Sequence, residues 1–223
     1  MGQENAKELI MVAGWYIWWE RRRLVHDEKI GKTRRSALAI RGIVGNELAR
    51  KRNSPDKVSR WSKPALGVLK LNVDAAFDVN VGSGALGAIL RDSSGMFIAA
   101  KNEFIQFAMD APSMEALALR LGLEMTEHMG VQSVAIECDS MEVVQAVLNP
   151  SEYRATGAVV IDDCRKKISD FGKATIMHCN RQANVCAHEL ARFSIRERSD
   201  GFWMDHPPDF LVPFIVKDLI VIE

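Results

Sequence analysis

The chain has 223 residues and a formal net charge of zero, and 48% of its residues are hydrophobic, so it can build a packed core and is not a wholly disordered protein. Its four cysteines form no Cys-x-x-Cys pair, which argues against a disulfide framework and favours reduced thiols inside the cell, in the nucleus or the cytoplasm.

The charge is distributed unevenly along the chain. Residues 1–63 contain 15 Lys and Arg against 7 Asp and Glu, whereas residues 64–223 contain 14 against 22. A basic segment beside an acidic one is compatible with nucleic acid bound next to a metal site.

The first sixty residues are expected to form a helical, basic extension. An apolar run from Leu9 to Trp19 is eleven residues long, well short of the ~20 that cross a bilayer as a helix, so no membrane association is expected. This run lies in a helix predicted over 4–27, and a second helix is predicted over 34–50. The breaker cluster at 53–56 indicates a linker before the next segment.

The following residues predict an antiparallel meander of three strands. A strand is predicted over 69–77, because residues 69–74 alternate between apolar and polar side chains. This alternation is typical of a strand with one buried face and places Asp74 on its polar face. Two further strands are predicted over 85–91 and 96–107. They are joined by a turn in which Gly95 accepts a positive φ. We expect the strand over 69–77 to hold Asp74 in a fixed position, where carboxylates from other elements can approach it.

Helices and strands then alternate along the chain. A helix is predicted to start at Ala111, with Ser113 as its N-cap and Glu115 in its first turn. A fourth strand ends just before Asp139, a residue that either caps the next helix or lies at the ligand-binding end of a central strand. The remaining predicted elements are a strand over 131–138, helices over 141–148 and 155–170, a strand over 174–179 and a helix over 180–198. The domain is expected to cover 61–198, and the apolar segment 199–223 is expected to pack on it as a tail.

Five motifs together resemble the ribonuclease H type 1 domain, in the form found in plant non-long-terminal-repeat retrotransposons and in proteins descended from them. They are Leu69-Lys70-Leu71-Asn72-Val73-Asp74; Gly87 with Arg91-Asp92 and Gly95; Glu115-Ala116-Leu117-Ala118-Leu119-Arg120 with Gly122-Leu123; Ile136-Glu137-Cys138-Asp139-Ser140; and Asn184-Val185-Cys186-Ala187-His188-Glu189-Leu190-Ala191. The resemblance implies an α/β fold, a five-stranded mixed sheet flanked by helices, after a helical N-terminal extension. The implied activity is hydrolysis of the RNA strand of an RNA–DNA hybrid.

The same resemblance implies a site for divalent metal ions. Asp74, Glu115 and Asp139 match three of the family's four metal-binding carboxylates, and the implied ions are Mg²⁺, which would activate a water and stabilise the leaving oxygen. Asn184 and Arg181 are implied to contact the nucleic acid. The expected partner is therefore an RNA–DNA hybrid, while the oligomeric state stays open.

Two histidines distinguish this chain from the family pattern. His188 occupies the fourth ligand position, where an Asp is usual, so it joins the catalytic set and is expected to impair cleavage. Because Mn²⁺ tolerates imidazole better than Mg²⁺ does, Mn²⁺ is expected to support more activity. His178 lies where some members of the family have a His that passes a proton to the leaving group.

Other functions stay open on the sequence alone. A domain with weak or lost cleavage would bind hybrid or structured RNA, and a remnant of a mobile element would have no selected activity. A 3′–5′ exonuclease is a further alternative, although Asp74-Ala75-Ala76 lacks the Asp-x-Glu pattern of that class. A zinc site is the last alternative, and its ligands would be His178, Cys179, Cys186 and His188.

Overall fold

The computed structural model describes residue 14 and residues 60–149 and 157–219. The helices predicted over 4–27 and 34–50 lie outside the described residues, apart from Gly14. Residues Trp61–Leu211 form one compact unit. Helix α7 (Val212–Leu219) belongs to a second unit.

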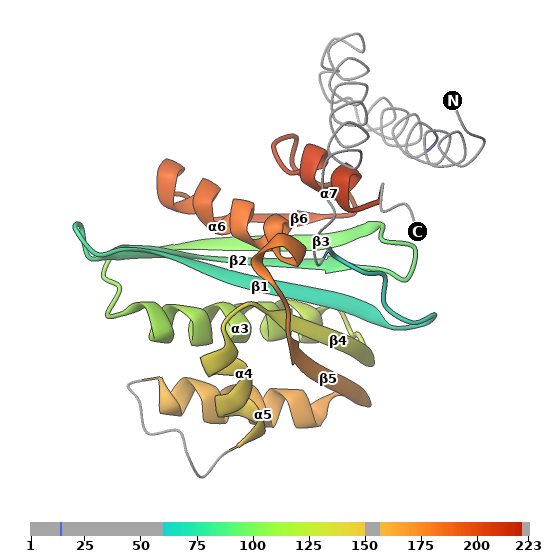
Figure 1. The fold of residues 1–223 in the computed structure, drawn as a ribbon, viewed down its shortest axis with the longest axis horizontal. Helices are drawn as coiled ribbons and strands as arrows, with labels where there is room; N and C mark the ends of the chain where they lie inside the picture. The colour runs from blue at the N-terminus through green and yellow to red at the C-terminus, as the bar shows by residue number, and fades with distance from the viewer. Residues whose placement is uncertain (1–13, 15–59, 150–156, 220–223) are drawn as a thin grey trace, which may run out of the picture. The chain divides into compact units, whose positions relative to one another are not determined.

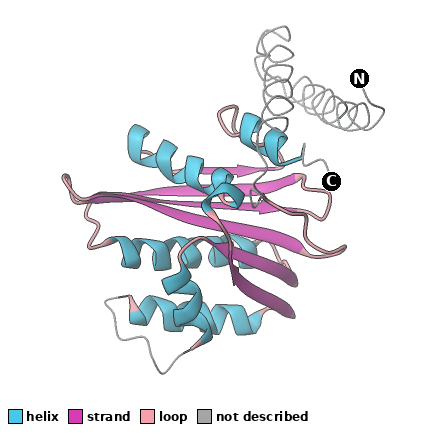
Figure 2. Ribbon diagram, viewed as in Figure 1, coloured by secondary structure: helices cyan, strands magenta, loops and turns pink. Residues whose placement is uncertain are grey.

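A six-stranded mixed sheet organises the unit Trp61–Leu211 (Figures 1 and 2). The strand order is β5-β4-β1-β2-β3-β6. The strands β1, β2, β3 and β6 pair antiparallel, whereas β4 runs parallel to both β1 and β5. The bounds are β1 Leu69–Asp78, β2 Ser83–Arg91, β3 Phe97–Ile105, β4 Ser133–Cys138, β5 Lys173–His178 and β6 Gly201–Met204.

The sequence predicted five of these strands and missed the sixth. Strand β6 is four residues long and lies in the segment for which the sequence predicted only a packing tail. It pairs with β3, with Gly201 opposite Asn102 and Met204 opposite Ala99. A strand this short spans only two periods of alternation, so its pattern cannot be distinguished from a loop. The turn before β3 agrees with the sequence, since Gly95 has φ of 85°.

Helices cover both faces of the sheet, and α6 (Val185–Glu197) lies on the face opposite α3 (Ala111–His128) (Figure 1). Helix α3 also contacts α4 (Met141–Leu148) and α5 (Ala158–Asp170). Helix α3 is capped by Asp110, whose side chain accepts a hydrogen bond from the Ser113 N–H at 2.7 Å, so the predicted cap at Ser113 was wrong by one turn. In the described part of the chain, no helix combines the length and apolar character that a bilayer span requires.

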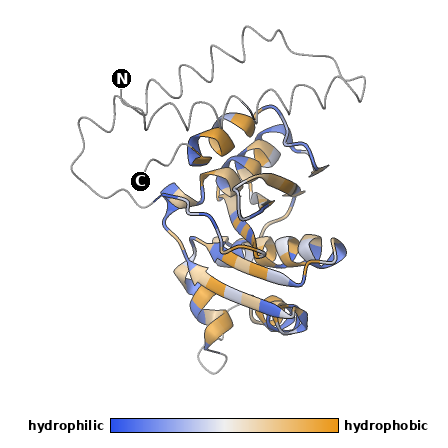
Figure 3. Ribbon diagram, turned by 90° about the vertical axis from the view of Figure 1, so that its right-hand side faces the viewer, coloured by the Kyte–Doolittle hydropathy of each residue, from blue (hydrophilic) through white to orange (hydrophobic). Residues whose placement is uncertain are grey.

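The hydrophobic core lies between the sheet and helices α3, α4 and α5. In Figure 3, the orange that marks apolar residues appears on the strands and on parts of the helices beside them. Strand β1 contributes Leu71 and Val73, which are fully buried. The alternating residues Lys70, Asn72 and Asp74 point to the other face, but they too are at most 4% exposed. The polar face predicted for this strand is therefore a buried polar face.

Two glycines allow the flanking helices to approach the sheet closely. A Cβ on Gly87 would lie 2.4 Å from the Ala187 carbonyl oxygen and 2.7 Å from the Ala191 nitrogen, both in α6. A Cβ on Gly122 of α3 would lie 2.6 Å from Val73 Cγ1. Gly87 is paired with Asp74 in the sheet, so its missing side chain lets α6 pack directly beside that carboxylate.

The last predicted helix is divided in two. Residues 180–198 contain a 3-10 turn, η1 (Arg181–Ala183), followed by α6, and Asn184 lies at the junction. Asn184 occupies the N-cap position of α6 but makes no capping hydrogen bond with its side chain. The amide is used elsewhere, because it donates to the Val73 carbonyl at 2.8 Å.

We predict that Gly87→Ala lowers the free energy of unfolding by about 1–3 kcal/mol, because the new methyl group must displace the α6 backbone. Urea unfolding followed by circular dichroism measures this change. The control is Gly172→Ala, where the nearest atom to the new Cβ, the Gln132 carbonyl oxygen, is 3.3 Å away. An equal effect of the two substitutions would contradict a specific close approach at Gly87.

Candidate active site

Asp74 is held in the middle of the sheet by β1 and is 3% exposed. Its register partner on the neighbouring strand β2 is Gly87, and α6 covers this position. The Asp74 Oδ2 atom lies 2.8 Å from Nδ1 of His188, which reaches it from α6. A carboxylate fixed by a central strand and by a helix has little freedom to move away from an incoming ligand.

Glu115 and Asp139 approach Asp74 from two other elements. Glu115 lies just past the first turn of α3, not within it as predicted, and Asp139 follows the last residue of β4. Strands β1 and β4 are parallel, and Val73 lies opposite Cys138. The residues that follow these two are Asp74 and Asp139, so the two aspartates lie side by side. The cap of α4 is Ser140, whose hydroxyl accepts from the Val143 N–H at 3.4 Å. Asp139 is thus not the N-cap of that helix.

The electrostatics show that these carboxyl groups crowd one another. Burial, the largest cause, raises the pKa of Asp74 to about 6, and Asp139 adds to the rise while the hydrogen bond from His188 opposes it. Burial also raises the pKa of Glu115 to about 9, with further contributions from the charges of Asp74 and Asp139. Acids arranged so that they resist ionisation are common at functional sites, where a cation or a substrate relieves the repulsion.

Asn184 and Arg181 surround Asp139. The Asn184 Nδ2 group donates to Asp139 Oδ1 at 3.1 Å as well as to the Val73 carbonyl, so Asn184 joins β1 to the end of β4. Asn184 is 1% exposed. The Arg181 Nε atom lies 3.5 Å from Asp139 Oδ2, and the Arg181 side chain is 86% exposed. Of the two residues predicted to contact nucleic acid, Arg181 is therefore accessible, whereas Asn184 points its donors inward.

His188 contacts Asp74 and lies at the edge of the site, with 40% of its side chain exposed. Its pKa is raised, chiefly by the hydrogen bond with Asp74. When Nδ1 carries its proton, the imidazole donates to Oδ2 and competes for an oxygen that a metal ion would also use. The structure brings together all four residues that the sequence assigned to catalysis.

The sequence did not single out Cys138, which also lies at this site. Ligand atoms of Glu115, Cys138 and Asp139 lie within 4.8 Å of one another, and this is the one such group in the described residues. The alternative zinc set of His178, Cys179, Cys186 and His188 therefore gains no support. Burial raises the pKa of the Cys138 thiol well above its ordinary value.

The donor set fits a hard divalent cation. Asp74, Glu115 and Asp139 supply carboxylate oxygens, the ligand type that Mg²⁺ and Mn²⁺ prefer. The Glu115 Oε2 atom is buried without a hydrogen-bond partner, which is costly unless another group satisfies it. A cation among the three carboxylates would both satisfy this oxygen and remove the repulsion.

A buried polar cluster on the same face of the sheet connects β1 to β4. Lys70 is paired with Glu137, and both are nearly inaccessible to solvent. Asn72 donates to Glu137 Oε2 at 3.1 Å and accepts from Trp61 Nε1 at 2.9 Å. The Arg91 guanidinium lies over the Trp61 ring at 3.7 Å and donates to Asn72 Oδ1 at 3.2 Å. Because Asn72 and Glu137 are register partners, the cluster fixes the pairing that aligns Asp74 with Asp139.

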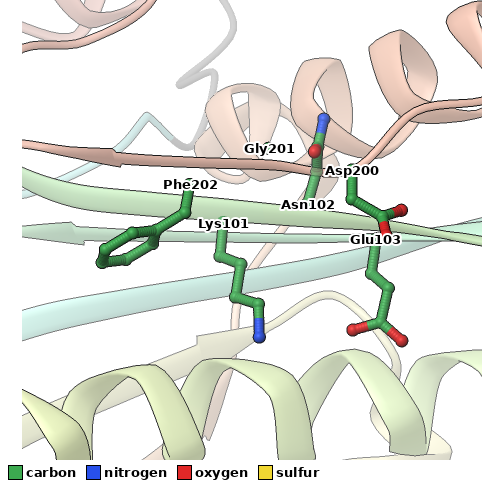
Figure 4. A pocket seen from close by; sticks show the side chains of 6 residues that line it. All are labelled: Lys101, Asn102, Glu103, Asp200, Gly201 and Phe202. Carbon is green, nitrogen blue, oxygen red and sulfur yellow. The ribbon is translucent and has the colours of Figure 1, made fainter.

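A shallow depression of about 320 Å³ lies between β3 and β6 (Figure 4). None of the four site residues lines it. In Figure 4, Lys101 and Glu103 extend on one side of the sheet, whereas Asn102 points to the other side, where it donates to the Leu190 carbonyl at 3.3 Å. Asp200 accepts from the Phe104 N–H at 2.8 Å. The lining residues are Lys101, Asn102, Glu103, Asp200, Gly201 and Phe202.

A family model described as reverse transcriptase-like matches residues 72–194, which is more than half of the chain and includes all four site residues. The chain belongs to this family. It carries an RNase H domain, as the resemblance of its motifs implied. An Arabidopsis thaliana protein named as a ribonuclease H protein is 24% identical over 165 residues, which are 74% of this chain and 26% of that relative. The chain thus spans about a quarter of the relative's length.

Solved structures establish the RNase H fold of the domain. The N-terminal RNase H domain of a Mycobacterium tuberculosis protein aligns with a TM-score of 0.54 at 19% identity, over 58% of this chain and 94% of that one. Ribonuclease H1 of Halobacterium salinarum aligns with a TM-score of 0.51 at 20% identity, over 59% of this chain and 99% of that one. LC11 ribonuclease H1, solved in complex with an RNA/DNA hybrid, aligns with a TM-score of 0.53 at 18% identity, over 58% of this chain and 98% of that one.

We predict that the metal-free protein loses stability as the pH rises from 5 to 8. The folded-state pKa values of Asp74 and Glu115, about 6 and about 9, lie above the ordinary values of 3.8 and 4.5. The folded state therefore holds more protons than the unfolded state in this range, so the free energy of unfolding falls with rising pH. One pKa unit is worth about 1.4 kcal/mol. For Asp74 only the interval between pH 5 and its folded-state pKa of about 6 contributes, so Asp74 alone accounts for ~1.4 kcal/mol of the loss. The raised pKa of His188 acts in the same direction.

Urea midpoints measured at both pH values with a chelator present test this. Glu115→Gln should be more stable than the parent at pH 8 and should flatten the pH dependence. The control is Glu124→Gln in the same helix, whose carboxylate lies 3.8 Å from Arg120 at the surface. A parent protein with equal midpoints at both pH values would show that the folded state does not hold these additional protons.

Proposed function

We propose that this domain hydrolyses the RNA strand of RNA–DNA hybrids, with Asp74, Glu115 and Asp139 holding divalent ions, Mg²⁺ or Mn²⁺. The observation that carries the proposal is the convergence of three carboxyl groups from β1, α3 and β4 in one buried, mutually repelling site. Membership in the family and the RNase H fold support it. Ions bound there would act as Lewis acids on the phosphodiester and generate the attacking hydroxide, as in other two-metal sites.

The residues of the chain prepare the site for this reaction. Asp74, at the centre of the sheet, is placed to face both neighbouring acids. Asn184 holds Asp139 through Oδ1 and leaves Oδ2 directed at the exposed Arg181. Arg181 is free to swing toward a phosphate group, since guanidinium groups bind phosphate oxygens in a bidentate manner. Glu115 would contact the ribose 2′-hydroxyl, the group that distinguishes RNA from DNA.

One observation favours a second function, the binding of nucleic acid with impaired cleavage. His188 Nδ1 lies 2.8 Å from Asp74 Oδ2 and so competes with a metal ion for this oxygen. A protonated imidazole would add a positive charge beside the ions and weaken their binding further. The two functions are separated by measuring hybrid cleavage and hybrid binding on the same preparation of the full-length chain.

We predict that Asp74→Asn abolishes hybrid cleavage in Mg²⁺ and in Mn²⁺, because an amide cannot supply the negative charge that holds the cations together. The substitution should not lower stability at pH 8, since burial already disfavours the ionised carboxyl. Cleavage of a labelled hybrid measures the effect, with Asp78→Asn at the end of the same strand as the control. A variant that cuts at the parent rate would remove Asp74 from the proposed site.

We predict that His188→Asp raises the Mg²⁺-dependent cleavage rate at least about tenfold, which corresponds to ~1.4 kcal/mol of barrier. The new carboxylate restores an oxygen ligand and frees Asp74 Oδ2. The parent should depend more strongly on Mn²⁺ than the variant does, because imidazole suits the softer ion better. His128→Asp, an exposed position at the end of α3, controls for the added negative charge. Equal Mg²⁺ rates for parent and variant from pH 5.5 to 8.5 would mean that His188 does not limit the reaction.

A further inference from the structure

Cys138 places a sulfur atom beside two of the carboxyl groups at the site. Its Sγ and the ligand atoms of Glu115 and Asp139 all lie within 4.8 Å of one another. Cys138 follows Val134 and Ile136 at a spacing of two residues on β4, so its side chain points into the same hydrophobic core as theirs. The thiol is fully buried, and the next residue, Asp139, begins the turn to α4.

Two oxygens in this neighbourhood lack a partner. Glu115 Oε2 is buried and has no hydrogen-bond partner. Asn184, which is 1% exposed and donates to Asp139 at 3.1 Å, also leaves its buried Oδ1 without one. Buried polar atoms are nearly always satisfied in folded proteins. An unsatisfied oxygen on one member of the group of Glu115, Cys138 and Asp139, and a second one on the residue that holds Asp139, therefore point to a bound cation.

The presence of sulfur decides which cations this group selects. Mg²⁺ prefers six oxygen ligands and gains little from a thiol. Zn²⁺ and Cd²⁺ bind thiolate strongly and accept carboxylate oxygens as further ligands, usually in a tetrahedral arrangement. The Ser140 N–H points at Sγ from 3.4 Å and would stabilise negative charge on the sulfur.

We propose that Cys138, Glu115 and Asp139 form a site for a thiophilic divalent ion such as Zn²⁺ or Cd²⁺, distinct in its ligands from the all-carboxylate set. On binding, the S–H bond breaks, the proton passes to solvent and an S–metal bond forms without any change of oxidation state. Because Glu115 and Asp139 belong to both sets, the two kinds of ion exclude each other. A thiophilic ion bound here would hold the protein in a form unable to load its hard ions, so the site would make the domain sensitive to free zinc.

The test uses the full-length chain and needs no cleavage assay. Co²⁺, a spectroscopic substitute for Zn²⁺, is titrated into the protein while the near-ultraviolet sulfur-to-cobalt charge-transfer absorption is recorded. We expect this absorption in the parent protein and its loss in Cys138→Ser, together with at least about tenfold weaker Zn²⁺ binding in competition. Cys164→Ser is the matched control, because Cys164 is also a buried thiol but lies in α5, where its Sγ faces the Ala116 carbonyl.

The cobalt absorption, and if necessary the cadmium NMR signal, decide the proposal. Charge-transfer absorption that is present in the parent and in Cys164→Ser but absent in Cys138→Ser supports it. A parent protein without this absorption, or one whose absorption persists in Cys138→Ser, overturns it. If Cys138→Ser fails to fold by circular dichroism, cadmium NMR of the parent decides, because the chemical shift reports directly whether sulfur is a ligand. Asp139→Asn should then weaken the cadmium signal, and an unchanged signal would place the ion elsewhere. Failure of the proposed ribonuclease activity would leave each of these binding results unaffected.

Discussion

The burial of Asp74 in the centre of the sheet is the constraint on which the site depends. A carboxylate with 3% exposure is tolerated only because specific groups surround it: an imidazole at 2.8 Å, the closely packed backbone of α6 and two further acids. The close approach of α6 requires the absence of a side chain at Gly87, which is the direct neighbour of Asp74 in β2. The same small position thus determines both the packing of the helix and the reach of His188.

The alignment of β1 with β4 is the second requirement. Residues that precede the aspartates on the two strands fix this parallel pairing. Lys70 forms a buried ion pair with Glu137, and Asn72 donates a hydrogen bond to Glu137 across the strands. A slip of one residue would break these contacts and turn the side chains to the opposite face. Burying charges is costly unless each is paired and hydrogen-bonded, so such a cluster favours one register over the alternatives more than it adds to stability.

Much of this arrangement could be predicted from local patterns. The two-residue alternation over residues 69–74 identified the central strand, and the glycine turn at Gly95 and the periodicity of α3 followed from equally local rules. The sequence could not show that Lys70, Asn72 and Asp74 face a second buried layer, because alternation gives the face of a strand and not what covers it. Strand β6 was missed since four residues give too short a pattern.

The candidate site shows the same division between local and distant information. Asp139 had two possible roles in the sequence, and only the hydrogen bond that the adjacent Ser140 hydroxyl accepts from the Val143 N–H shows which residue caps the helix. The inward direction of Asn184 depends on the Val73 carbonyl and on Asp139, both far away in the chain. Cys138 was passed over because a cysteine in a strand is usually part of the core, and its proximity to Glu115 arises only when α3 packs on the sheet.

The indole of Trp61 has a consequence for how this domain can be separated from the rest of its chain. Its ring covers the guanidinium of Arg91 and its N–H group bonds to Asn72, so a residue that precedes the first strand by eight positions closes the polar cluster beneath the aspartates. A fragment that begins at Leu69 lacks this indole. It would expose to water the charged groups of Lys70 and Arg91 and the side-chain amide of Asn72. The smallest autonomous module, suitable for transfer into another protein, must therefore begin before Trp61 and not at Leu69.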